Sequence, residues 1–131
     1  MEIIENNKIK QDFIKGKHLL DQGKHEESIK IFDALIEISI NELDSYEDNI
    51  TLHTSLNNRG IAKCKLGATI NDKSLYISGM NDLKKAVVLF GLSDSNLKPQ
   101  ASQNLKKAES VVQIWGKTYR EPDTHIIFQT M

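Results

Sequence analysis

Length, composition and charge narrow the classes to which this chain could belong. Its 131 residues suit one domain, and the 39% hydrophobic and 27% charged fractions are ordinary for a globular chain rather than for a disordered or membrane protein. The 17 basic and 18 acidic residues leave a formal charge of -1 and are scattered along the chain, whereas nucleic-acid binding would require Lys and Arg gathered in one place, so we expect a globular domain that binds neither nucleic acid nor membrane.

Apolar residues recur along the chain at steps of three and four, the spacing of one helix face, and predict five helices. The glycines at positions 23, 67, 91 and 116 mark expected helix ends, and Pro99 suits the first turn of the last helix. The polar stretches 45–49 and 68–74 are expected to be loops. The predicted helices are 3–23, 25–44, 50–66, 75–91 and 97–116.

The character of the chain changes after Gly116. Residues 117–131 are predicted to form an extended tail, because the apolar run from His125 to Phe128 has β-preferring residues and is too short for a helix. An exposed apolar tail is unfavourable in water. We therefore expect residues 124–128 to pack either against the helices or against a neighbouring copy of the chain.

Two parts of the sequence repeat a common pattern. Gly16 and Gly23 are separated by the same interval as Gly60 and Gly67. We expect the first glycine of each pair to lie where two helices approach closely, because it has no side chain, and the second to end its helix. The helices that follow share a small, a large and a medium or small residue at matching positions, namely Ser28, Phe32 and Leu35 in the first and Gly79, Leu83 and Ala86 in the second.

This pattern resembles the tetratricopeptide repeat. The matching stretches are KGKHLLDQGKHEESIKIFDAL in the first repeat and NNRGIAKCKLG with SGMNDLKKAVVLFG in the second. The resemblance implies an all-α fold of antiparallel helix hairpins, stacked as a short right-handed solenoid. A helical domain at 1–116 would comprise repeat one at about 9–44, repeat two at about 50–91 and a C-terminal helix at about 97–116, followed by the tail at 117–131.

The chain departs from the family pattern at several points. Asp12 stands where the family usually has a large apolar residue, and Leu35 is bulky for its position. Neither repeat ends with the usual proline, and the stretch 68–74 adds residues between the helices of the second repeat. Whether the last predicted helix belongs to a third repeat is left open.

In the family, the first helices of the pairs line a concave groove that receives a peptide or a helix of another protein. The resemblance therefore implies a partner-binding surface, which the tail could also occupy as an internal stand-in for a ligand. Its lysines would favour an acidic stretch and its apolar residues would supply contact area, although each residue alone equally fits a solvated or a core position. The implied residues are Lys10, Phe13, Lys17, Leu20, Thr54, Asn57, Asn58, Ile61 and Lys65.

Some members of the family bind the C-terminal carboxylate of chaperones through a set of lysine, arginine and asparagine side chains. Asn58 matches one of these asparagines, but Phe13 and Lys17 replace the lysine and asparagine of the first repeat. The set is incomplete, so we favour a mixed polar and apolar groove over recognition of chaperone tails.

No motif indicates an enzyme, a cofactor or a metal. The histidines lack the paired helical spacing of metal ligands, and the glycines are not clustered as in a phosphate-binding loop. Cys64, beside Ala62 and Leu66, is expected to be an apolar filler and, as the single cysteine, cannot form an internal disulfide. Residues 1–7 also lack the features of a signal peptide, which together favours a cytoplasmic protein.

The sequence leaves two functions open. The first is an adaptor that binds a segment of a partner protein, and the alternative is an inhibitor or immunity-type protein that covers and blocks a toxin or an enzyme. A tight inhibitor should bury about 1,600 Å² in total, whereas an adaptor should bind an isolated segment with roughly micromolar affinity. Self-association through the open ends of the array is also left open.

Overall fold

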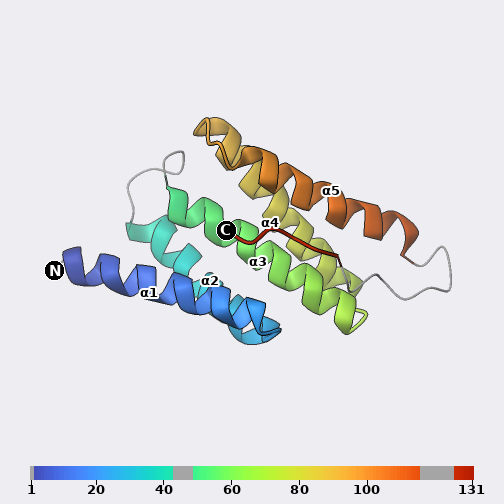
Figure 1. Ribbon diagram of the computed structural model, residues 1–131, viewed down its shortest axis with the longest axis horizontal. Helices are drawn as coiled ribbons and strands as arrows, with labels where there is room; N and C mark the ends of the chain where they lie inside the picture. The colour runs from blue at the N-terminus through green and yellow to red at the C-terminus, as the bar shows by residue number, and fades with distance from the viewer. Residues whose placement is uncertain (1, 43–48, 116–125) are drawn as a thin grey trace.

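Five α-helices make up the part of the chain that the computed structural model describes, which comprises residues 2–42, 49–115 and 126–131. Consecutive helices run antiparallel, and α3 lies in the middle, in contact with each of the other four (Figure 1). The prediction of an all-helical chain is therefore confirmed over these residues. The helices are α1 (Glu2–Asp21), α2 (His25–Glu42), α3 (Ile50–Thr69), α4 (Lys73–Leu92) and α5 (Lys98–Ile114).

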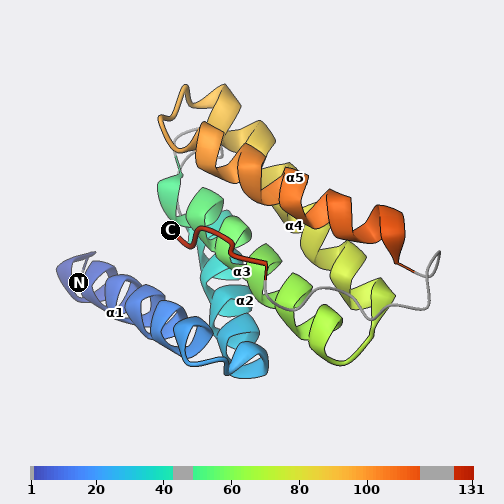
Figure 2. The same ribbon diagram turned by 45° about the vertical axis from the view of Figure 1, so that its right-hand side comes forward.

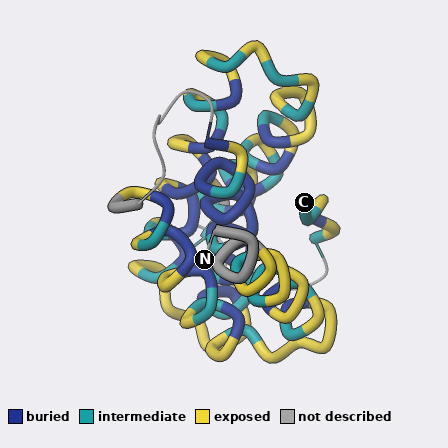
Figure 3. Tube along the Cα trace, turned by 90° about the vertical axis from the view of Figure 1, so that its left-hand side faces the viewer, coloured by how far each residue is buried: buried dark blue, intermediate teal, exposed yellow. Residues whose placement is uncertain are grey.

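The central helix α3 is buried along most of its length. Every residue from Leu52 to Asn58 is buried, and Figure 3 shows buried positions concentrated inside the helix layers while much of α1 faces outward. A helix surrounded in this way is normally apolar, yet Asn57 and Asn58 are both 0% exposed. Their amide groups therefore need hydrogen-bond partners inside the molecule.

In the first hairpin, α1 and α2 pack against each other at Gly16. A Cβ atom at Gly16 would lie 2.8 Å from Cζ of Phe32, so only glycine leaves room for this ring. The hydroxyl of Ser28 donates a hydrogen bond to the carbonyl oxygen of Gly16 over 3.0 Å. The predicted close approach of the two helices at Gly16 is confirmed, with a phenylalanine ring as the principal neighbour.

The hairpin of α3 and α4 repeats this arrangement with a closer approach of the two backbones. A Cβ atom at Gly60 would lie 2.7 Å from the carbonyl oxygen of Gly79 and 2.9 Å from Cγ of Leu83. Conversely, a Cβ atom at Gly79 would lie 2.6 Å from the carbonyl oxygen of Gly60. Gly60, Gly79 and Leu83 thus occupy the places that Gly16, Ser28 and Phe32 hold in the first hairpin, as the sequence repeat predicted.

Gly23 ends α1 as predicted. It has a φ of +77°, a left-handed conformation that glycine adopts without strain, and it follows the last helical residue by two positions. The amide of Lys24 then donates to the carbonyl oxygen of Leu19 over 2.8 Å. This closes the helix end and starts the turn into α2.

Gly67 does not end its helix, and this prediction was wrong. Helix α3 continues to Thr69, and Gly67 is a buried packing position within it. A Cβ atom there would lie 2.7 Å from the backbone nitrogen of Tyr76. The turn is supplied instead by Asn71, with a φ of 57°, and Asp72, whose carboxylate accepts from the amide of Leu75 and caps α4. The loop predicted at 68–74 is therefore only the turn at 70–72.

The other helix boundaries follow the sequence pattern closely. Pro99 lies in the first turn of α5, and α4 ends at Leu92, one residue after the predicted glycine. The predicted loop at 45–49 and the predicted stop at Gly116 fall largely or wholly outside the described residues. Within the described part of the chain, none of the helices is long and apolar enough to cross a membrane.

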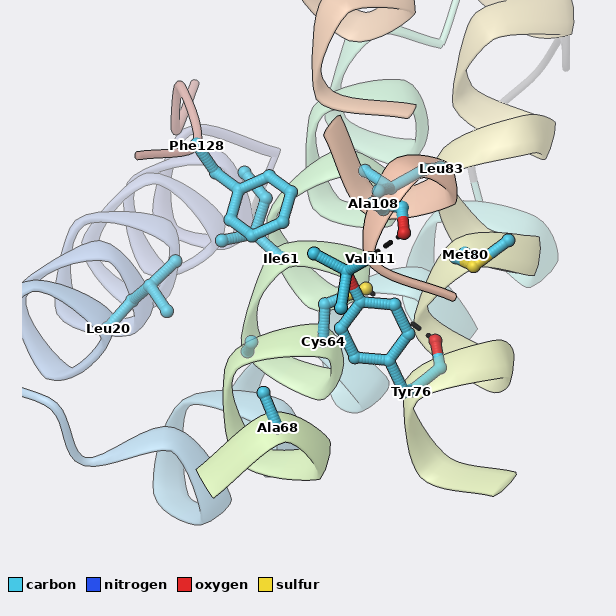
Figure 4. Packing of buried hydrophobic residues seen from close by; sticks show 11 residues of the cluster. Leu20, Ile61, Cys64, Ala68, Tyr76, Met80, Leu83, Ala108, Val111 and Phe128 are labelled. Carbon is cyan, nitrogen blue, oxygen red and sulfur yellow. Dashed lines mark hydrogen bonds between the residues drawn. The ribbon is translucent and has the colours of Figure 1, made fainter. Parts of the chain in front are cut away.

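Helix α5 packs on α4. The hydroxyl of Tyr76 donates to the carbonyl oxygen of Ala108 over 3.0 Å (Figure 4). The Tyr76 and Trp115 rings meet edge to face with centroids 5.1 Å apart. One core cluster includes Ile61, Leu83 and Ala108 and so joins α3, α4 and α5. A second lies nearer the other end of these helices, and its buried members are Ile36, Leu52, Leu56, Ala86, Phe90 and Ala101.

Ion pairs tie three helices together around Arg59 of α3. Its guanidinium donates to both carboxylate oxygens of Asp82 in α4, over 2.7 and 2.8 Å, and to Asp33 of α2 over 2.9 Å. Burial disfavours the charge of Arg59, but these hydrogen bonds and charges raise its pKa above the ordinary value. The Asp82 side chain is only 6% exposed, whereas that of Asp33 is 51% exposed.

We expect Asp82→Ala to lower the free energy of unfolding by about 2 kcal/mol, because it leaves Arg59 partly buried without its bidentate partner. The matched change Asp33→Ala removes an exposed partner of the same arginine and should cost less than about 1 kcal/mol. Urea denaturation of both variants measures the difference. Equal losses would show that the buried pair contributes no more than the exposed one.

Candidate functional site

The segment of residues 126–131, called here the tail segment, lies in an elongated groove across α3. The segment runs across α3 without helical structure, with α1 on one side and α5 on the other (Figures 1 and 2). The groove is defined here by the residues of α1, α3 and α5 that contact the segment, which include Leu20, Asn58 and Asn104. This confirms that apolar residues near the end of the chain pack against the helices. Thr124 and His125, which were included in that prediction, lie outside the described residues.

Asn104 of α5 holds the backbone of the tail segment through a reciprocal pair of hydrogen bonds. Its Nδ2 donates to the carbonyl oxygen of Gln129 over 2.9 Å, and the Gln129 amide donates to Oδ1 of Asn104 over 2.8 Å. A carboxamide can replace a neighbouring strand in this way because it presents a donor and an acceptor side by side. The contact involves only the backbone of Gln129, which is an exposed residue.

Two asparagines of α3 complete this contact. Asn57 donates from Nδ2 to the same carbonyl oxygen over 3.3 Å and accepts from Asn104 over 3.1 Å. Oδ1 of Asn58 accepts from the amide of Met131 over 2.8 Å and from Asn57 over 3.2 Å. Asn57, Asn58 and Asn104 are all 0% exposed, and together we call them the asparagine cluster. The tail segment thus supplies hydrogen-bond partners to Nδ2 of Asn57, to Oδ1 of Asn58 and to both polar atoms of Asn104. Nδ2 of Asn58 has no partner among the described residues.

Phe128 and Met131 anchor the tail segment, and the partly buried Ile126 packs against the same core cluster as Phe128. Phe128 is 8% exposed and belongs to the core cluster that contains Leu20 and Ile61, and Figure 4 shows its ring directed toward Ile61. Met131, three positions later, packs against the second core cluster. Ile127, by contrast, is 78% exposed. The groove therefore binds the segment both through its backbone and through its apolar side chains.

Lysines surround the groove. Nζ of Lys107 donates to the carbonyl oxygen of Ile127 over 2.8 Å. Lys65 lies with Leu20 along the part of the groove occupied by residues 126–128. At the other end, beside Met131, the groove opens into a hollow of about 490 Å³ whose lining includes Lys10 and Lys17. Among the described residues, the lining beside Met131 has two lysines and no acidic side chain, whereas Asp21 lies with Lys65 at the other end.

The structure places all nine residues of the predicted partner-binding surface along this groove. Asn57 and Asn58 bond the tail segment, and Ile61 and Leu20 share a core cluster with Phe128. Lys65 lies near residues 126–128. The others line the hollow beside Met131, and they are Lys10, Phe13, Lys17 and Thr54. Phe13 also meets the ring of Phe32 edge to face, with centroids 5.8 Å apart, so it has a core contact as well.

Sequence reasoning missed the contribution of α5. Asn104 makes the most complete contact with the tail segment, and Lys107 adds another. The signal for Asn104 was present, because it interrupts the buried stripe of Ala101, Ala108 and Val111 at helical spacing. A buried asparagine on an otherwise apolar face indicates a specific hydrogen-bond partner.

Cys64 lies in the core, as expected of an apolar filler. Its Sγ donates to the carbonyl oxygen of Tyr76 over 3.6 Å, and Figure 4 shows it between α3 and α4. Burial, reinforced by the negative charge of Asp82, raises the pKa of the thiol far above its usual range. Among the described residues, no group of three or more His, Cys, Asp or Glu side chains could hold a metal ion.

We expect the native protein to resist thiol modification, because a protonated and buried Cys64 is a poor nucleophile. Ellman's reagent at about pH 8 should react with Cys64 only after unfolding in urea, whereas an exposed thiol would react at once. Rapid reaction of the folded protein would contradict the position of Cys64 in the core.

None of the comparisons, with protein-family models, with curated proteins and with solved structures, finds a match to this chain. The resemblance to the tetratricopeptide repeat therefore stays a prediction from sequence.

Proposed function

We propose that this chain is a non-enzymatic protein–protein interaction module that binds an extended segment of a partner protein in the groove of α1, α3 and α5. The observation that carries the proposal is that the groove holds residues 126–131 through hydrogen bonds to their backbone, made by Asn57, Asn58 and Asn104. Contacts to backbone atoms suit any extended segment, and the pockets for side chains then select among segments.

We further propose that the two hairpins are tetratricopeptide-like repeats in a short solenoid. The close contact of Gly60 with Gly79 and the packing of Gly16 on Phe32 support a shared repeat geometry. In this arrangement α1 and α3 are the first helices of their pairs and form the concave side, and α5 continues the array. The groove is then the concave surface of the stack.

The test is binding of a separate peptide to the full-length protein. Phe128→Ser removes the principal anchor of the tail segment, so that a fluorescent peptide with the sequence Ile-Ile-Phe-Gln-Thr-Met can compete for the groove. We expect saturable binding by fluorescence anisotropy with a dissociation constant of roughly micromolar order, and no binding of a peptide with the same residues in scrambled order. Failure of the native peptide to bind any better than the scrambled peptide would refute the proposed function.

A further inference from the structure

The groove is not filled to its end by the tail segment. Met131 lies at the edge of the hollow of about 490 Å³, which is formed by α1 and the first turns of α3. Apolar side chains of α1, including Ile9 and Phe13, line it together with Lys10 and Lys17, and none of the described residues in the lining is acidic. A segment that continued past the position of Met131 would enter this hollow and meet two positive charges.

The side chains of the tail segment offer no charge to these lysines, because none of the side chains of residues 126–131 is charged. The contacts of the tail segment do show which of its residues the groove binds. Phe128 and Met131 contact the core clusters, while Ile127 is 78% exposed and Gln129 is held by its backbone. The groove therefore takes up Phe128 and Met131, three positions apart, with the partly buried Ile126 packed before them, and places the next residues beside Lys10 and Lys17.

Resting on the proposed function, we infer that the partner segment has an aromatic residue, a methionine or aliphatic residue three positions later, and acidic residues directly after it. The tail segment is a competing ligand with the first two features and without the third. A partner with acidic side chains at this place gains attractions to Lys10 and Lys17 that none of the side chains of residues 126–131 makes, and it therefore competes with the tail segment for the groove. The partner must bind tightly to displace the tail segment, because a ligand in the same chain has an effective concentration of roughly millimolar order.

The pattern is tested with peptides and the full-length Phe128→Ser variant. Adding Asp-Glu-Asp after Ile-Ile-Phe-Gln-Thr-Met should tighten binding about tenfold relative to adding Ser-Asn-Ser, and salt should reduce the gain. Replacing the peptide's phenylalanine or methionine with serine should weaken binding about tenfold, whereas alanine at its second isoleucine or its glutamine should change it less than about twofold. Equal affinity for all of these peptides would overturn the inferred pattern.

The role of the hollow is tested by charge reversal on α1. Lys10→Glu with Lys17→Glu should abolish the preference for the acidic extension. The matched control is Lys8→Glu with Lys15→Glu, which makes the same change in net charge at exposed positions of the same helix that do not line the hollow. Loss of the preference in both double variants would assign the effect to overall charge and overturn the assignment to the hollow.

Competition by the tail segment is tested by comparing the unmodified protein with two variants. Phe128→Ser and Gln129→Pro, which removes the amide that donates to Asn104, should each bind the acidic peptide about tenfold more tightly than the unmodified protein. Equal affinity of all three proteins would overturn the competition. Absence of any peptide binding would refute the proposed function itself, so the two failures are distinguishable.

Discussion

Gly60→Ala is expected to lower the free energy of unfolding by about 3 kcal/mol, because the new methyl group would force two backbones apart. Its Cβ would lie 2.7 Å from the carbonyl oxygen of Gly79 and 2.9 Å from Cγ of Leu83. A backbone oxygen cannot rotate away as the end of a side chain can, so α3 and α4 must separate. Thermal or urea denaturation followed by circular dichroism measures the loss.

The control for this change is Gly91→Ala in the same hairpin. The nearest atoms to a Cβ at Gly91 belong to the side chain of Lys98, at 3.5 Å, which is an ordinary contact distance. Since alanine favours the helix over glycine, this variant should be more stable by roughly 0.5 kcal/mol. If Gly60→Ala were as stable as Gly91→Ala, the close contact of α3 with α4 would be wrong.

Asn104→Ala is expected to lower the free energy of unfolding by about 3 kcal/mol and to release the tail segment. Three hydrogen bonds disappear, two to Gln129 and one to Asn57, each worth about 1 kcal/mol. Hydrogen exchange of the Gln129 amide should become fast at the same time. Urea denaturation and NMR-detected exchange measure the two effects.

Gln129→Ala separates the backbone contact from the side chain. Only backbone atoms of Gln129 bond the asparagine cluster, so this variant should change the free energy of unfolding by less than about 0.5 kcal/mol. A loss as large as that of Asn104→Ala would mean that the side chain, rather than the backbone, of Gln129 is recognised.

Most of the fold could be predicted from the sequence because its helices carry clear periodic signals. Gly16 and Gly60 were correctly placed at close helix contacts, since a glycine within a helix is costly unless packing requires it. The prediction that Gly67 ends its helix was wrong because the sequence does not distinguish two uses of glycine. A glycine near a helix end serves either as a terminator or as a packing position, and here the backbone of Tyr76 lies where its side chain would be.

The groove was predicted in part. Asn57 and Asn58 were identified through the family resemblance, and the apolar tail was expected to pack because an exposed Phe128 is unfavourable. The meeting of these residues with Asn104 could not be predicted, because it brings together positions far apart in the sequence. Single-sequence periodicity indicates which face of a helix is buried, but it does not indicate which other segment covers that face.

The position of the tail segment is the claim on which the proposed function depends, and NMR spectroscopy of the full-length protein tests it most directly. If residues 126–131 lie in the groove, nuclear Overhauser effects will connect the ring protons of Phe128 with methyl groups of Leu20 and Ile61, which share its core cluster. Absence of these effects, together with random-coil chemical shifts for residues 126–131, would contradict it.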